Sequence, residues 1–140
     1  MSPPLARGLF LTIKTTLRWI IFEIILVSKV DLFQLYIMEF RSIYITAKDD
    51  AEARKISQIL VWEKLVACVN YFPIKSIYWW KGDVEESKEI ALIAKTRLEL
   101  VEKVIERVKQ IHSYEVPCVV SWKIESGNID YLDWIKNSTE

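Results

Sequence analysis

Glycine, cysteine and histidine are all scarce in this chain of 140 residues. Its three glycines form neither a dinucleotide-binding motif nor a P-loop, so glycine-rich phosphate binding is excluded. Its two cysteines are too few for the disulfide framework of a small secreted domain, and one histidine excludes a zinc site with two histidines from one chain. Basic and acidic residues number 19 each, and the resulting net charge of zero argues against nucleic acid as a partner.

Apolar residues, by contrast, make up 51% of the chain, which is enough for a hydrophobic core. They are especially frequent in residues 1–37, but charged residues interrupt every apolar window that is long enough to span a membrane. No small-residue cleavage site follows, so a secretory signal is not expected.

Two interpretations of residues 1–37 remain open. In the first, the natural protein begins at Met38 and the segment is upstream sequence read in frame. In the second, the segment is an amphipathic helix that docks on a membrane or on a partner. Lys14, Arg18 and Lys29 fall near one helical face, which agrees with the second interpretation.

Residues 38–140 carry an alternation of strand and helix patterns, and we expect them to form one domain. In chain order the patterns predict a strand at 40–47, a helix at 50–64, strands at 66–81 and 83–96, a helix at 100–111, a strand at 118–124 and a short helix at 128–136. This order is typical of the ferredoxin-like βαββαβ arrangement, an α+β fold with both main helices on one face of a four-stranded sheet.

The two central strands form a predicted hairpin that is unusually long. Ordinary strands run to about 5–6 residues, whereas these arms cover 66–81 and 83–96, around a turn at Gly82. Pro73 cannot donate a backbone hydrogen bond, so a bulge or bend is expected there. Two helices cannot cover arms of this length, and an uncovered apolar edge favours pairing with other chains. We therefore expect self-association through the hairpin.

Four ordered motifs resemble those of one known family. They are Glu63–Asn70 (EKLVACVN), Ser76–Gly82 (SIYWWKG), His112–Pro117 (HSYEVP) and Asp130–Ile135 (DYLDWI). Together they are similar to the motifs of the CutA family of divalent-ion tolerance proteins. The resemblance covers almost everything from Met38 to Ile135 and none of residues 1–37.

This resemblance implies a ferredoxin-like subunit in a homotrimer with the architecture of the PII signalling proteins. It implies a non-catalytic protein of divalent-cation tolerance that binds metal ions or a small ligand in the clefts between protomers. The alternative is a PII-like signalling or scaffold trimer with no metal role. The residues agree with a non-catalytic role, because no GxSxG nucleophile motif is present. Unpaired thiols and the lack of an export signal favour the cytoplasm.

The metal that the family name implies is copper (Cu²⁺) or another divalent cation, and His112 is the candidate ligand. Some family members use a cysteine and two adjacent histidines, but here the matching positions hold Ile45, Ile111 and His112. A metal site would therefore need His112 from several protomers. Alternatively, His112 is a core or capping histidine after the second long helix. Cys68 and Cys118 lie in apolar strands, where a cysteine usually serves as a small buried hydrophobic residue.

The aromatic residues at the end of the first hairpin arm form the second candidate site. Alternation places Tyr78 and Trp80 on one face of the strand. They form either a wall of a ligand cleft between protomers or an anchor of the protomer interface, because Trp and Tyr dominate the energetics of buried contacts. The candidate residues of this cleft or interface are Tyr78, Trp80, Glu89, Lys95, Tyr114 and Glu115.

Overall fold

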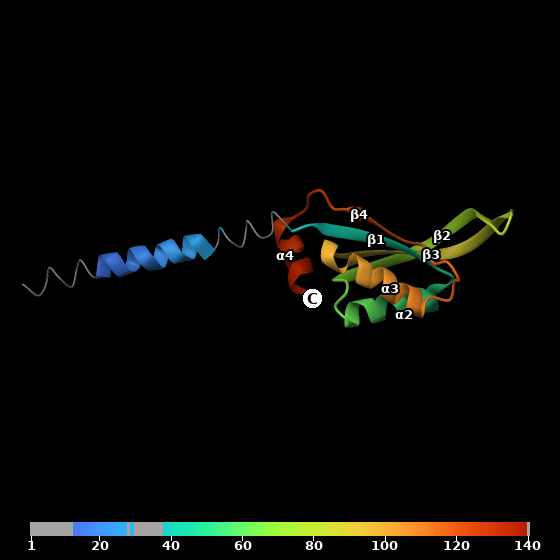
Figure 1. The fold of residues 1–140 in the computed structure, drawn as a ribbon, viewed down its shortest axis with the longest axis horizontal. Helices are drawn as coiled ribbons and strands as arrows, with labels where there is room; N and C mark the ends of the chain where they lie inside the picture. Colours follow the sequence, from blue (N-terminus) through green and yellow to red (C-terminus); the bar gives the residue numbers. More distant parts are fainter. Residues whose placement is uncertain (1–12, 28, 30–37, 140) are drawn as a thin grey trace, which may run out of the picture. The chain divides into compact units, whose positions relative to one another are not determined.

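The computed structural model describes residues 13–27, 29 and 38–139. The chain divides into two compact units, Met1–Ile37 and Met38–Glu140. In the first unit, residues 13–27 form an α-helix with exposed side chains (Figure 1, blue). No helix within the described ranges is both long and apolar enough to cross a bilayer. That the natural protein begins at Met38 stays a prediction.

The second unit is built on an antiparallel sheet of four strands in the order β2-β3-β1-β4. Strand β1 (Phe40–Ala47) pairs with β3 (Asp83–Arg97) on one side and with β4 (Val119–Lys123) on the other. Strand β2 (Cys68–Trp80) pairs with β3 alone. Consequently β2 and β4 are the two edges of this sheet.

Helices α2 (Asp50–Trp62) and α3 (Val101–Ile111) lie on one face of the sheet (Figure 1). Helix α2 begins where the Asp49 side chain accepts a hydrogen bond from the Glu52 amide at 2.8 Å, which caps the helix. A 3₁₀ turn, η1 (Leu98–Leu100), leads from β3 into α3. The core forms between the helices and the sheet and includes Ile43, Ile45, Ile56, Leu60, Leu92, Val104 and Val108.

A last helix, α4 (Ile129–Asn137), follows β4. The Asn128 side chain caps it by accepting a hydrogen bond from a first-turn amide at 3.1 Å. Beyond the helix, the Arg97 guanidinium donates to the Thr139 hydroxyl at 3.0 Å and to the Thr139 carbonyl at 3.2 Å. These contacts tie the end of the chain to the end of β3.

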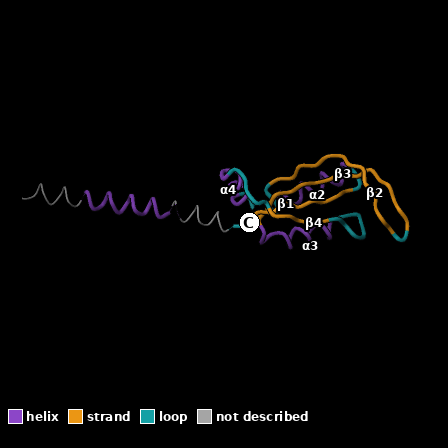
Figure 2. Tube along the Cα trace, turned by 90° about the horizontal axis from the view of Figure 1, so that it is seen from above, coloured by secondary structure: helices purple, strands orange, loops and turns teal. Residues whose placement is uncertain are grey.

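The β2–β3 hairpin extends past the helices, as its two long orange strands in Figure 2 show. Lys81 and Gly82 form its turn, with φ of 49° and 93°. Positive φ at both central residues is what a type I′ turn requires, and it confirms the predicted turn at Gly82. Towards this end Ile77 and Trp79 are 70% and 75% exposed, so the helices do not cover the hairpin.

Of the bulge or bend predicted at Pro73, the bulge is absent, and that part of the prediction is wrong. Pro73 lies opposite Ile90 in a register that continues unbroken to both ends of β2. Because β2 is an edge strand, a proline nitrogen can face the open edge without removing a hydrogen bond from the ladder. The predicted α+β class and the order of strands and helices are confirmed.

Candidate ligand site

A cavity of about 720 Å³ lies where the β2–β3 hairpin meets the segment that follows α3. Strand β2 supplies an aromatic wall, β3 supplies one carboxylate, and the segment after α3 supplies the opposite side. The structure thus brings five of the predicted site residues together, namely Tyr78, Trp80, Glu89, Tyr114 and Glu115.

Glu89 is buried in this cavity, with 6% of its surface exposed. Its carboxylate accepts a hydrogen bond from the Tyr114 hydroxyl, with the two oxygens 2.9 Å apart. Burial raises the pKa of Tyr114, and the hydrogen bond to Glu89 and the charge of Glu89 raise it further. Burial and then the same charge also raise the pKa of the Cys118 thiol. These two neighbours are therefore neutral at neutral pH, and neither compensates the charge of the carboxylate.

Tyr78 and Trp80 form the aromatic wall, and they are 40% and 38% exposed. The Lys81 ammonium lies 5.5 Å from the centroid of the Trp80 ring, which is within cation–π range. The same ammonium lies 3.7 Å from the Glu115 carboxylate. Both charged groups are mostly exposed, so this ion pair contributes little to stability. The Trp80 ring is therefore already in contact with a cation of this chain, and Glu115 lies at the rim of the cavity.

The side chain of His112 is fully buried next to this cavity and holds the segment after α3 in place. Its Nε2 lies 2.7 Å from the Thr46 carbonyl oxygen, and its Nδ1 accepts a hydrogen bond from the Tyr114 amide at 3.0 Å. Nε2 therefore carries the proton and donates to Thr46. The Glu52 carboxylate supports the same segment by accepting from the Ser113 amide at 2.8 Å. A metal ion would have to displace one of the two imidazole hydrogen bonds, and the metal role of His112 stays a prediction.

Lys95 lies outside the cavity, in contrast to the other candidate residues. Its ammonium donates to the side-chain oxygen of Asn70, near the start of β2. Lys95 is opposite Cys68 in the register, whereas Glu89 is opposite Ile74. Six residues along a strand correspond to about 20 Å. Within this chain Lys95 and Glu89 therefore belong to different parts of the hairpin.

Sequence reasoning missed two groups that line the cavity from other strands. Thr46 comes from the end of β1, and Cys118 comes directly before β4. They meet because β1 and β4 are neighbours, with Ile45 opposite Val119. Only the order of the strands in the sheet reveals that Thr46 and Cys118 meet, because no local sequence pattern connects residues so far apart in the chain.

The fold and the cavity together define a class of small α+β protein, in which two helices cover one face of a four-stranded antiparallel sheet and a long hairpin carries a ligand cavity. The family model described as CutA1 divalent ion tolerance protein matches residues 41–138. The chain belongs to this family, as the motifs in residues 63–135 predict.

Known relatives agree with this assignment. The "Divalent-cation tolerance protein CutA" of Archaeoglobus fulgidus is 48% identical over 98 residues, which cover 70% of this chain and 96% of the relative. Human "Protein CutA" is 39% identical over 98 residues, which cover 69% of this chain and 55% of the relative. Among solved structures, that of the periplasmic divalent cation tolerance protein CutA from A. fulgidus has a TM-score of 0.71 at 46% identity, covering 72% of this chain and 99% of that one.

Proposed function

We propose that this chain forms a non-catalytic homotrimer of ferredoxin-like subunits, in which the cleft at Glu89 binds a divalent cation. One observation carries the proposal: a carboxylate with 6% exposure opens onto a cavity and faces the neutral hydroxyl of Tyr114 and the neutral thiol of Cys118. Burying a carboxylate is costly, and the entry of a cation would lower this cost. Lys75 also lines the cavity, so a bound ion would compete with the Lys75 ammonium for the carboxylate. The names of the relatives refer to divalent cations, which agrees with a cation as the ligand.

The donor set of one protomer is incomplete for such an ion. Within residues 13–27, 29 and 38–139, no three His, Cys, Asp or Glu side chains are grouped so as to hold a metal. Glu89 and the rim residue Glu115 offer carboxylate oxygens, which suit hard cations better than soft ones. The proposed site therefore needs a second protomer, which could add a carboxylate such as its own Glu115 to the cleft.

The two open edges of the sheet support a closed ring of protomers. Strand β2 exposes Ile77 and Trp79, and β4 exposes Val120 and Trp122 at 53% and 46%. Large apolar side chains on exposed edge strands favour association. Contacts between two different edges are heterologous, and heterologous contacts form rings such as trimers where the rotation between neighbours closes, and open filaments where it does not.

A non-catalytic role agrees with the chemistry of the cavity. Its single thiol, Cys118, has a pKa that burial raises, so it is a poor nucleophile. The alternative function is a PII-like signalling or scaffold trimer, whose clefts would take a small organic ligand such as a nucleotide instead of a metal ion.

Titration calorimetry tests this proposal directly. Wild-type protein, Glu89→Gln and the matched control Glu86→Gln would each be titrated with Mn²⁺, Zn²⁺, Cu²⁺ and ATP. Gln keeps the shape of residue 89 and its hydrogen bond from Tyr114 but removes the charge. Glu86 is an exposed carboxylate three residues earlier on the same strand. We expect cation affinity to fall by roughly a hundredfold to several thousandfold in Glu89→Gln, because removing one partner of a buried charge pair costs roughly 3–5 kcal/mol and each 1.4 kcal/mol is a factor of ten.

Equal cation affinity in wild type and Glu89→Gln would contradict the proposed site. Binding of ATP without binding of any cation would favour the signalling alternative. Light scattering on the same samples reports the oligomeric state, and a folded monomer in dilute buffer would contradict the trimer.

We also propose that the protein acts in the cytoplasm. Cys68 and Cys118 are both free thiols, which suits a reducing compartment. The A. fulgidus relative is described as periplasmic, so fractionation of cells with an antibody against this chain is the direct test. Recovery in the periplasmic fraction would contradict the proposal.

A further inference from the structure

The helix formed by residues 13–27 exposes far more apolar surface than a stable protein surface tolerates. Ten large apolar side chains of this helix are each between 47% and 62% exposed. Contiguous apolar patches on soluble monomers rarely exceed a few hundred Å², and larger patches mark interaction sites. This helix therefore presents a binding surface, and the nature of its occupant follows from how its side chains are distributed.

The helix has one continuous aliphatic face. At 3.6 residues per turn, six aliphatic side chains fall within about 120° of its circumference. This aliphatic face consists of Ile13, Leu17, Ile20, Ile21, Ile24 and Val27. All the charged side chains of residues 13–27 and 29 lie on the remaining arc.

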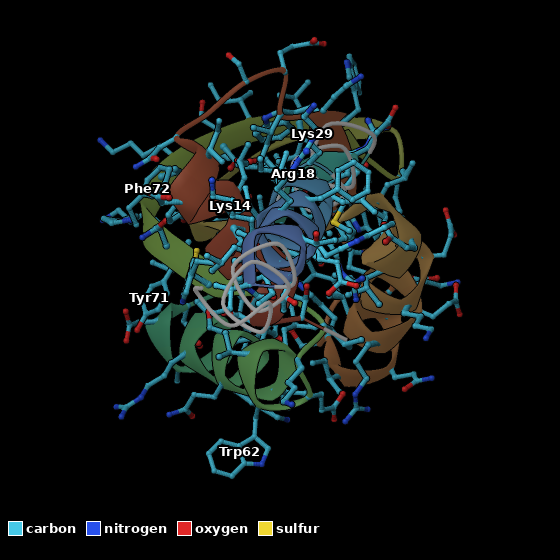
Figure 3. The ribbon with its side chains drawn as sticks, turned by 90° about the vertical axis from the view of Figure 1, so that its left-hand side faces the viewer. Lys14, Arg18, Lys29, Trp62, Tyr71 and Phe72 are labelled. Atoms are coloured by element: carbon cyan, nitrogen blue, oxygen red, sulfur yellow. The ribbon has the colours of Figure 1, made fainter. Side chains whose placement is uncertain are left out.

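The charges on that remaining arc are mostly basic. Lys14, Arg18 and Lys29 fall within about 60° of one another, directly beside the aliphatic face. Figure 3 views the helix almost along its axis and shows these three side chains on the same side of it. Glu23 is the single acidic side chain of residues 13–27. Long basic side chains beside an aliphatic face can reach phosphate groups while their stems stay in apolar surroundings.

We infer that residues 13–29 bind the surface of a lipid bilayer that contains anionic headgroups. The helix would lie in the plane of the interface, with its aliphatic face in the acyl region and its basic residues among the phosphates. A helix of 15 residues is about 22 Å long, which is shorter than the hydrocarbon core of about 30 Å, so it would not cross the bilayer.

Three basic side chains against one acidic side chain favour an anionic lipid surface over a second copy of the helix. Trp19 and Phe22 lie on the arc opposite the aliphatic face, so neither a helix–helix seam along that face nor the acyl region of a bilayer would bury them. Trp19 and Phe22 pack edge to face with their ring centroids 6.4 Å apart. On the surface of a bilayer, aromatic side chains on that arc would lie at the headgroup level.

Vesicle flotation of the full chain tests this inference. The protein would be mixed with vesicles of phosphatidylcholine and phosphatidylglycerol, and separately with vesicles of phosphatidylcholine alone. We expect flotation with the first and much weaker flotation with the second. The double variant Lys14→Gln with Arg18→Gln should bind the anionic vesicles about thirtyfold less tightly, because each basic residue near such a surface contributes about a factor of five.

A matched pair of double variants tests the aliphatic face itself. Ile20→Glu with Ile24→Glu places two charges on that face, whereas Phe22→Glu with Leu26→Glu places the same two charges, at the same spacing, on the opposite arc. We expect the first pair to abolish flotation and the second to weaken it much less. Circular dichroism and the melting temperature of each variant show that residues 38–139 remain folded.

Several outcomes would overturn the inference. They are failure of the wild type to float with anionic vesicles, equal flotation with both lipid mixtures, and equal losses in the two matched variants. Association into larger oligomers that depends on Ile20 and Ile24, without flotation, would make a second copy the occupant instead. If mass spectrometry of the native protein finds Met38 as its first residue, the cellular protein lacks this surface.

Discussion

Removal of the His112 imidazole is the most informative single perturbation of the site. The buried ring joins β1 to the segment after α3, because Nε2 donates to the Thr46 carbonyl at 2.7 Å and Nδ1 accepts from the Tyr114 amide at 3.0 Å. The variant His112→Ala would leave both backbone groups without these partners. It would also release the segment that carries Tyr114 to the carboxylate of Glu89.

The expected loss follows from these contacts. A buried polar group that loses its hydrogen bond costs about 1–3 kcal/mol, and two such groups are affected. Deletion of the ring also leaves a cavity, which adds to the cost. We therefore expect the free energy of unfolding to fall by about 3–5 kcal/mol in His112→Ala.

Two further variants divide this loss between the hydrogen bonds. In His112→Asn the side-chain oxygen can replace Nδ1 as the acceptor from Tyr114, and in His112→Gln the amide nitrogen can replace Nε2 as the donor to Thr46. Each should recover about half of the stability that His112→Ala loses. If His112 serves as a metal ligand instead, copper affinity will fall in all three variants.

Guanidinium unfolding followed by tryptophan fluorescence measures these differences. All variants must be compared at one protein concentration, because the stability of an oligomer depends on the concentration of its protomers. A wild-type midpoint in His112→Ala would refute the structural role of the ring. Identical losses in all three variants would refute the division into two separate hydrogen bonds.

Three more predictions concern the turn, the interface and the effect of acid. Gly82→Val should lower the melting temperature, because φ at this position is 93° and a β-branched residue there is strained by about 1–2 kcal/mol; wild-type melting would contradict the turn assignment. Trp80→Ala should weaken the proposed trimer by about 3–5 kcal/mol if the ring is enclosed there, and an intact trimer at high dilution in light scattering would count against this. Burial opposes the ionisation of Glu52, but hydrogen bonds, above all from Ser113, lower its pKa below the usual 4.5. Because the folded pKa lies below the unfolded one, this carboxylate stabilises the fold above pH 4.5 and ceases to do so as the pH falls through the folded value, so Glu52→Gln should melt with a weaker acid dependence in that range.

The succession of strands and helices could be predicted because each element has a local pattern. Ile43 and Ile45 alternate along β1, and Val101, Val104 and Val108 recur at helical spacing in α3; all five are buried. Whether Pro73 requires a bulge could not be predicted in the same way. A proline disrupts the ladder of a central strand but can be accommodated on an edge strand, so the answer depends on whether β2 is an edge strand. The order of the strands decides that point, and no local pattern contains it.

The candidate site could be predicted in part. Alternation along β2 places Tyr78 and Trp80 together, and the structure brings Glu89, Tyr114 and Glu115 to the same cavity. It places Lys95 elsewhere on the hairpin, because a strand of 15 residues extends much farther than the cavity does. The length of β3 could be predicted from the sequence, but the position of the cavity along that strand could not.

The sequence alone therefore determined the α+β class, the family, the long hairpin and the turn at Gly82, because each depends on residues close together in the chain. The tertiary structure decided which charges are buried and what faces them. Glu89 and Tyr114 are separated by 25 positions, and His112 and Thr46 by 66. Pairing of β1 with β3 and β4 brings such residues into contact, and the exclusion of water there gives one carboxylate its unusual surroundings.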